Sequence, residues 1–233
     1  MKLEICANSY QSAINAQKAG ADRIELCTEL SVGGITPSYG SLKKVADEIS
    51  IPVHILIRPR SGNFCYTDDE FQQMKANIKL CKEFGFNGIV SGVLNTDNSI
   101  DLERTRELIQ LAKPLSFTFH RAFDCVNNPK KALEQLIDLG VDRILTSGLK
   151  EKAIDGIELL KELKKIANNK LTILPGSGIN PSNAHEFKEA GFQEIHTSAS
   201  KEKKNSKVFF DTTKQTVSDI ETIQEILKVI KDV

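Results

Sequence analysis

The segment from Ser116 to Asp124, SFTFHRAFD, brings together residue types that enzymes use for acid–base chemistry. Its phenylalanines alternate with Ser116, Thr118 and His120, which is the period-two pattern of a strand with one apolar and one polar face. Such a strand lies either at the solvent-exposed edge of a sheet or beside a polar site. His120, followed by Arg121 and Asp124, fits a general acid or base with an orienting carboxylate. A histidine that only hydrogen-bonds a neighbouring carbonyl would show the same pattern.

Other strand-like segments also carry polar residues on the face opposite to their valines, isoleucines and leucines. The polar residues expected on the inner face are Glu4, Cys6, Glu25, Cys27, Arg58, Ser147, His196 and Ser198. Because several independent strands share this polarity, we expect their ends to converge on one site. The candidate catalytic residues are Glu4, Glu25, Arg58, His120, Asp124 and His196. Ion pairs between Arg58 and the two glutamates would explain the same buried charges.

Strand-like and helix-like segments alternate along the whole chain and would position these residues. The phrases AGADRIEL, FGFNGIV, LGVDRILTS and AGFQEIHTS each place a glycine after a helix and an isoleucine four residues later. The glycine ends the helix in a left-handed conformation, and the chain then enters a strand. Two strand–helix units fit between successive phrases, which predicts eight units. We therefore expect residues 1–233 to form one (β/α)8 TIM barrel, with the site at the carboxyl ends of its strands. A doubly wound open sheet is the alternative.

The composition is that of a soluble globular protein and argues against two classes of partner. Lys plus Arg and Asp plus Glu both number 31 among 233 residues, so no basic excess favours nucleic acid or an anionic membrane. No apolar run approaches the roughly 20 residues of a membrane span, and the N-terminus, MKLEICANSY, lacks the apolar run of a signal peptide. Five widely spaced cysteines argue against a disulfide framework. We therefore expect a cytoplasmic protein with reduced thiols.

Two further groups of residues are candidate ligand sites. Cys6 and Cys27 end adjacent predicted strands at equivalent depth, so their thiols could together bind Cu(I), which soft thiolates select. Buried free cysteines also serve as small hydrophobic residues. The loop LPGSGINPSN follows the seventh predicted strand, where barrels often hold a phosphate beside a helix N-terminus. The expected anion-binding residues are Arg60, Gly176, Ser177, Gly178 and Ser198. A glycine-rich turn required by geometry alone is the alternative.

Several short stretches also carry a family pattern over nearly the whole chain. They are EICANS at Glu4, RIELC at Arg23, GGITPS at Gly33, RPRSGNFCY at Arg58, FHRAFD at Phe119, RILTSG at Arg143, PGSGIN at Pro175 and IHTSAS at Ile195. In these stretches the chain resembles the CutC family, named for copper homeostasis. The resemblance implies a cytosolic single-domain TIM barrel that forms a homodimer or another small homo-oligomer and is associated with copper tolerance. Cu(I) binding by cysteines has been proposed for family members, and the matching positions are Cys6 and Cys27.

Two functional hypotheses follow. The first is a copper homeostasis protein that binds Cu(I) without turnover. The second is an enzyme that acts by acid–base chemistry on a small anionic substrate, such as a phosphorylated one. The family resemblance favours the first hypothesis. The inward-facing polar set is richer than a chelator needs, and this favours the second.

Overall fold

Short strands alternate with helices from one end of the chain to the other. The computed structural model describes residues 1–203 and 215–231. The first eight strands are β1 (Lys2–Ala7), β2 (Arg23–Leu26), β3 (Val53–Leu56), β4 (Gly88–Ser91), β5 (Ser116–Phe119), β6 (Arg143–Thr146), β7 (Thr172–Pro175) and β8 (Glu194–Thr197). The helices are α1 (Tyr10–Ala19), α2 (Tyr39–Glu48), α3 (Asp68–Glu83), α4 (Leu102–Ala112), α5 (Pro129–Leu139), α6 (Ile157–Ala167), α7 (Ala184–Glu189) and α8 (Ile220–Lys231).

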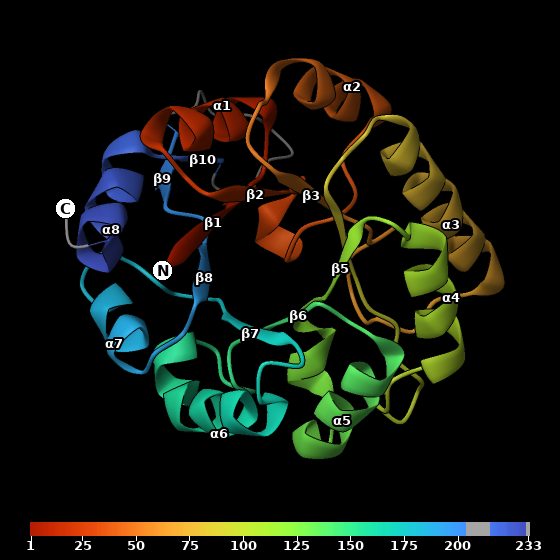
Figure 1. The fold of residues 1–233 in the computed structure, drawn as a ribbon. Helices are drawn as coiled ribbons and strands as arrows, with labels where there is room; N and C mark the ends of the chain where they lie inside the picture. The colour runs from red at the N-terminus through yellow and green to blue at the C-terminus, as the bar shows by residue number, and fades with distance from the viewer. Residues whose placement is uncertain (204–214, 232–233) are drawn as a thin grey trace.

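These strands form one parallel sheet that closes on itself (Figure 1). The strand order is β7-β6-β5-β4-β3-β2-β1-β8, so that the first strand pairs with the last. A parallel bridge between Gly176 and His196 joins β7 to β8. The helices surround the strands. This arrangement confirms the predicted (β/α)8 barrel and rejects the open sheet.

Side chains and glycines set the helix ends as the sequence predicts. Thr67 caps α3 and forms a reciprocal capping box with Glu70. Pro129 occupies the first turn of α5, where its missing N–H is not needed. Gly20, at φ 89°, and Gly140, at φ 78°, end α1 and α5 in the left-handed region that favours glycine. Each end fixes where the following strand starts, and therefore how deep its residues lie in the barrel.

Each barrel strand turns one face to the helices and the other to the interior. Phe117 and Phe119 of β5 are buried in the large core that the helices share with the sheet. A separate apolar cluster inside the barrel consists of Cys6, Cys27, Leu56 and Val90. The predicted alternation is therefore observed, and the interior is a mixture of polar groups and a few apolar side chains.

The central segment changes conformation earlier than the sequence predicts. β5 ends at Phe119, and a 3-10 helix spans Arg121–Cys125. His120 begins this helix, since its Nδ1 accepts a hydrogen bond from the Ala122 N–H at 3.3 Å. Asp124 therefore lies on a turn above the barrel and not in line with the strand.

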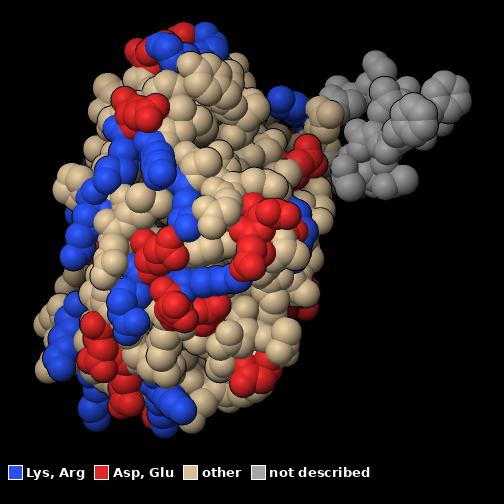
Figure 2. Space-filling view, turned by 90° about the vertical axis from the view of Figure 1, so that its right-hand side faces the viewer, with Lys and Arg blue, Asp and Glu red and all other residues tan. Residues whose placement is uncertain are grey.

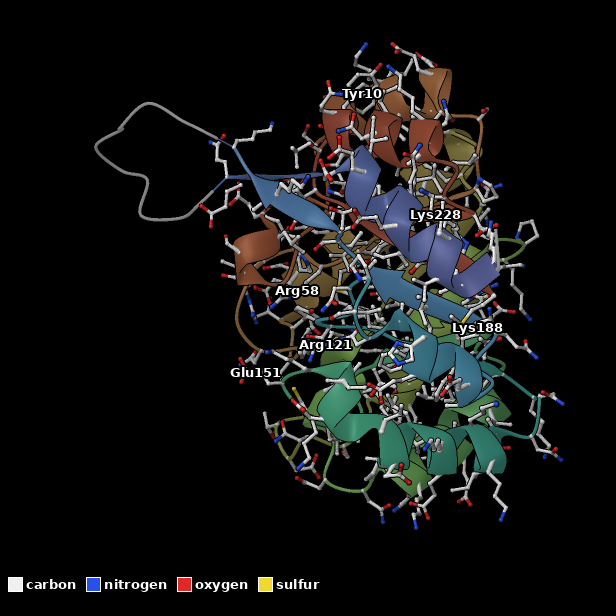
Figure 3. All side chains as sticks on the ribbon, turned by 90° about the vertical axis from the view of Figure 1, so that its left-hand side faces the viewer. Tyr10, Arg58, Arg121, Glu151, Lys188 and Lys228 are labelled. Atoms are coloured by element: carbon white, nitrogen blue, oxygen red, sulfur yellow. The ribbon has the colours of Figure 1, made fainter. Side chains whose placement is uncertain are left out.

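A small hairpin follows the last barrel strand. It pairs β9 (Ser200–Glu202) with β10 (Thr216–Ser218) in antiparallel fashion and precedes α8. The hairpin lies on the same side of the molecule as Arg58 and Arg121 (Figure 3).

Acidic and basic residues are interspersed on the face that Figure 2 shows, in keeping with the equal numbers of each in the sequence. In the described part of the chain, no helix combines the length and the apolar character needed to cross a bilayer.

Candidate functional site

The strand ends surround a cavity of about 680 Å³. Predicted site residues on its wall are Cys6, Glu25, Arg58, His120, Asp124, Ser177, Gly178, His196 and Ser198. Glu4, Cys27, Arg60 and Gly176 are not on the wall. The predicted convergence at the carboxyl ends of the strands is therefore observed for most of the set, and it joins residues from the first to the last barrel strand.

A buried ionic network lies next to this cavity. Arg23 donates hydrogen bonds to the carboxylates of Glu4 and Glu194. Arg143 adds a second ion pair to Glu194, with Nε 3.0 Å from the carboxylate. The alternative in which Arg58 pairs with Glu4 is not observed, since the partner of Glu4 is Arg23. We refer to Glu4, Arg23, Arg143 and Glu194 as the buried ionic network.

His196 connects this network to the cavity. Its Nδ1 lies 2.8 Å from Glu4 Oε1, and its Nε2 lies 3.4 Å from Glu25 Oε2. Burial alone would lower the pKa of His196, but a hydrogen bond with Cys6 and the charges of both glutamates raise the pKa well above its usual value. The metal-free ring is therefore an imidazolium at neutral pH.

The pKa values of the two glutamates beside this imidazolium are shifted in opposite directions. Burial would raise the pKa of Glu4, but the Arg23 guanidinium and His196 hold that pKa well below the usual range. Burial raises the pKa of Glu25, and His196 offsets only part of this effect. Glu4 is thus a permanent carboxylate, whereas Glu25, on the cavity wall, is the group suited to gain and lose a proton.

Two thiols meet beside His196. Cys6 Sγ and Cys27 Sγ are 3.7 Å apart, as expected for thiols on adjacent strands. The ligand atoms of Cys6, Glu25 and His196 all lie within 4.8 Å of one another. The hydrogen bond with Cys27 and burial raise the pKa of Cys6 well above its usual value, so the metal-free residue is a thiol.

This group of side chains suits a soft metal ion. Thiolates select Cu(I), and an imidazole is a further good ligand for copper. With metal–sulfur bonds of about 2.3 Å, two bonds in line would span about 4.6 Å, which exceeds the present spacing of the two sulfurs. That spacing favours a bent pair of thiolates with His196 Nε2 as a third ligand. Glu4 on Nδ1 would orient the ring, because a carboxylate commonly holds the second nitrogen of a metal-bound histidine.

His120 and Asp124 do not form the predicted acid–base pair. The Asp124 carboxylate accepts hydrogen bonds from Thr146 Oγ1, from the N–H of Ser147 and from Arg121 Nε. Burial, together with the Arg58 guanidinium, lowers the pKa of His120 to about 3, so the imidazole is neutral. Asp124 therefore joins two loops, and His120 has no orienting carboxylate.

The two arginines of the third loop brace the backbone. Arg58 donates from Nη1 to the carbonyls of Val32 and Gly34, both at 2.8 Å, and from Nη2 to a third carbonyl. Arg60 is paired with Glu70, with Nε 2.5 Å from Oε1, and makes further contacts within its own loop. Both side chains thus stabilise the loops that they contact, and Arg60 is not on the cavity wall.

The loop after β7 has only part of the predicted anion-binding form. The Gly176 N–H is not free, since it donates to Thr146 O at 3.0 Å. Ser177 and Gly178 do line the cavity, as does Ser198. Helix α7 begins only at Ala184, so its N-terminus does not lie directly after this loop, as the predicted phosphate site requires. The intervening residues form a turn in which Asn180 Oδ1 accepts from the Ser182 N–H.

The sequence analysis did not identify three members of the buried ionic network, Arg23, Arg143 and Glu194, or the position of Arg121 on the cavity wall. Arg23 precedes Glu25 by two residues, and Glu194 precedes His196 by two residues. The same alternation that identified Glu25 and His196 as inward-facing would have identified both neighbours. Arg121, on the cavity wall, had no such signal because it follows the end of the strand.

Comparisons with known proteins agree on one family. The model of the CutC family matches residues 1–201. The family protein CutC of Edwardsiella ictaluri is 51% identical over 199 residues, which cover 85% of this chain and 79% of that protein. The family protein CutC of Proteus mirabilis is 50% identical over 201 residues, which cover 86% and 80% of the two chains.

Solved structures show the same relationship at the level of the fold. A crystal structure from Streptococcus agalactiae, described as a candidate copper homeostasis protein CutC, superposes with a TM-score of 0.80 at 36% identity, covering 85% of this chain and 98% of that one. The thiamine phosphate pyrophosphorylase of Pyrococcus furiosus superposes with a TM-score of 0.63 at 13% identity, covering 99% and 96%. The second likeness reflects the shared barrel alone.

Proposed function

Because the chain belongs to the CutC family, we propose that it is a copper homeostasis protein that binds one Cu(I) ion at Cys6 and Cys27, with His196 as a third ligand. The observation that carries this proposal is the 3.7 Å separation of the two sulfur atoms, together with the ligand atom of His196 within 4.8 Å of Cys6 Sγ. The S. agalactiae relative, described as a candidate copper homeostasis protein, supports the choice of metal. The ion is cargo that the protein holds, and no turnover is required.

The residues around the sulfurs would determine how the ion is held. Cu(I) takes the place of the thiol protons, so binding releases protons and weakens as the pH falls. His196 would lose the proton on Nε2 and keep the one on Nδ1, which Glu4 accepts. The ion would reach Cys6 through the cavity, since Cys6 lies on its wall and Cys27 does not.

An anaerobic titration against a Cu(I) chelator tests this proposal. The wild type should retain one equivalent against the chelator, and Cys6→Ser and Cys27→Ser should each lose it. Cys125→Ser, which alters an exposed thiol, is the matched control and should bind as the wild type does. His196→Gln should weaken binding, because it removes the third ligand and leaves the two thiolates. Retention of a tight equivalent in the Cys6→Ser, Cys27→Ser double variant would reject the site.

The family resemblance also leads us to infer a cytoplasmic protein that forms a small homo-oligomer. All five cysteines are free thiols, which suits a reducing compartment. Light scattering of the purified protein tests the oligomeric state, and fractionation of cells tests the location. A monomer at all concentrations, or recovery outside the cytoplasm, would contradict this inference.

A second candidate function is acid–base catalysis on a small anionic substrate. It is favoured by the opposite pKa shifts of Glu4 and Glu25, because enzymes separate paired carboxylates in this way to make one of them a proton carrier. The test is exchange of a ligand's C–H hydrogen with deuterated water, followed by NMR for any ligand that the protein binds. Wild type should catalyse the exchange, and Glu25→Gln should bind the ligand without exchange. Equal exchange in both would exclude Glu25 as the proton carrier.

A further inference from the structure

Two backbone N–H groups on the cavity wall have no partner. The N–H groups of Ser177 and Gly178 make no hydrogen bond with any described residue, whereas the preceding N–H of Gly176 donates to β6. Both residues line the cavity. They also have left-handed backbones, at φ 92° for Ser177 and φ 70° for Gly178. A non-glycine residue in this region is strained, and such strain is concentrated at ligand-binding loops.

Other contacts hold this loop in place and leave the two N–H groups open. Ser177 Oγ donates to the Glu151 carbonyl at 2.7 Å, and the Ser177 carbonyl accepts from Ala153 N–H at 3.0 Å. The Gly178 carbonyl accepts from the side chains of Asn180 and Asn183. The carbonyls of Ser177 and Gly178 thus have hydrogen-bond donors, whereas the N–H groups of these two residues have no acceptor among the described residues. A ligand that supplies acceptors would complete the loop at little conformational cost.

Arg121 brings a positive charge to the same cavity. Its Nε donates to Asp124 at 2.7 Å and its Nη2 to Ser147 Oγ at 2.9 Å. Its Nη1 has no hydrogen-bond partner among the described residues, and the side chain is 43% exposed. Ser147 lies in the loop after β6, as does Glu151, whose carbonyl accepts a hydrogen bond from Ser177 Oγ. The loops after β5, β6 and β7 therefore meet at this part of the wall.

The acidic groups of the cavity do not oppose an anion there. Both oxygens of Asp124 already accept hydrogen bonds, including the one from Arg121. Glu25 is paired with the imidazolium of His196, which lies beside Gly176 at the start of this loop and offsets the carboxylate charge. The wall near Ser177 thus offers free donors and a guanidinium, which together suit a phosphate or a carboxylate.

The size of the cavity indicates an organic ligand and not a bare ion. A volume of about 680 Å³ falls within the range of roughly 300–1,000 Å³ in which proteins hold small molecules. His120 also lines the cavity. Since its Nδ1 accepts an N–H, the neutral ring carries its proton on Nε2, a buried donor with no partner. Buried donors without partners are rare in proteins, and a ligand oxygen is one way to satisfy them.

We propose that the mouth cavity binds a small organic phosphate or carboxylate, with the anionic group on the N–H groups of Ser177 and Gly178 and on the Arg121 guanidinium. This site is separate from the thiols of the copper proposal and does not depend on them. It also does not depend on proton transfer by Glu25.

Thermal unfolding of the metal-free protein tests the site with a pair of probes. Glycerol 3-phosphate and glycerol have the same carbon skeleton, and only the first carries a phosphate group. At about tenfold excess over Kd, glycerol 3-phosphate should raise the Tm by about 3–6 °C, and glycerol at the same concentration should leave it unchanged. 3-Phosphoglycerate and inorganic phosphate complete the set. We expect inorganic phosphate to bind more weakly, because it leaves most of the cavity empty.

Variants of the loop assign the effect to this place. Ser177→Asp puts a carboxylate beside the free donors and should abolish the shift. Ser177→Asn is the control, because an asparagine side chain has the size of an aspartate without its charge. Asparagine and aspartate both tolerate the left-handed backbone. Ligand should therefore raise the Tm of Ser177→Asn above that of the same variant without ligand. Arg121→Met should weaken binding by about tenfold through loss of a charged donor. Cys6→Ser should abolish Cu(I) binding and leave the shift intact.

Three results would overturn the proposal. They are equal shifts in Ser177→Asp and Ser177→Asn, a shift with glycerol as large as with its phosphate, and the absence of a shift with every anion. A response to inorganic phosphate equal to that of glycerol 3-phosphate would reject the organic part of the ligand. Since Cys6→Ser separates the two sites, failure of the copper proposal would leave these results interpretable.

Discussion

The two ends of the barrel interior treat polar groups in opposite ways. In the buried ionic network every charge has a partner, with Arg23 between Glu4 and Glu194 and with Arg143 on Glu194 as well. At the mouth, by contrast, His120 Nε2 and the N–H groups of Ser177 and Gly178 have none among the described residues. In barrels of this type the carboxyl end of the sheet serves function and the opposite end serves stability. The charged groups follow that division, whereas His54 Nδ1, buried near the ionic network, also lacks a hydrogen-bond partner among the described residues.

The largest expected effect comes from breaking the paired end. Arg23→Met leaves Glu4 and Glu194 as buried carboxylates short of a partner, and we expect the free energy of unfolding to fall by about 3–5 kcal/mol. Arg121→Met at the mouth is the matched control and should cost less than about 1 kcal/mol, because its ion pair is partly exposed. Urea unfolding measures both. Similar losses in the two variants would contradict the division between the ends.

A smaller effect concerns a neutral histidine inside the barrel. Burial lowers the pKa of His54 to about 4 from 6.5, so the unfolded chain binds a proton that the folded protein does not. The contribution of His54 to the free energy of unfolding is therefore fully present above pH 6.5. It falls by about 1.4 kcal/mol per pH unit as the pH decreases towards 4. Urea unfolding of wild type and His54→Leu between these pH values isolates the effect, since other groups titrate in both. If the difference in the free energy of unfolding between the two proteins did not change with pH, the pKa of His54 would not be lowered in the folded protein.

The smallest of the three effects tests how tightly the mouth is packed. A Cβ at Gly92 would lie 2.7 Å from His120 Nδ1, so Gly92→Ala should destabilise the protein by about 1–3 kcal/mol. Gly40→Ala, on α2, is the control, since a Cβ there meets nothing within 4 Å and alanine favours a helix by up to about 1 kcal/mol. Thermal unfolding measures both changes. If Gly92→Ala were as stable as the wild type, the ring of His120 could move away from the added methyl group. The mouth of the barrel would then be loosely packed.

The sequence predicted the barrel and most of the cavity wall because both depend on local patterns. Glycine after each helix marks where a strand begins, and alternation along that strand identifies Glu25 and His196 as inward-facing. Partners across the barrel follow no such rule. Glu4 pairs with Arg23 and not with Arg58, because the choice depends on which side chain reaches the same depth from another strand.

Groups outside the strands were predicted least well. Asp124 lies in the sequence beside His120, yet the 3-10 helix turns its carboxylate towards Thr146 and Ser147 on the next strand. Gly92 likewise has no side chain because the ring of His120 occupies the space that a Cβ would need. Both are properties of neighbours that are distant in sequence, which one chain without related sequences does not reveal.

The pairing of β1 with β8 makes the proposed copper centre a product of the completed chain. Cys6 lies on β1, Cys27 follows β2, and His196 lies on β8. Domains generally fold as units. The histidine therefore joins the two thiols only when the last barrel strand has been added. A nascent or truncated chain would hold copper by two sulfurs at most, so the full ligand set itself marks a finished barrel.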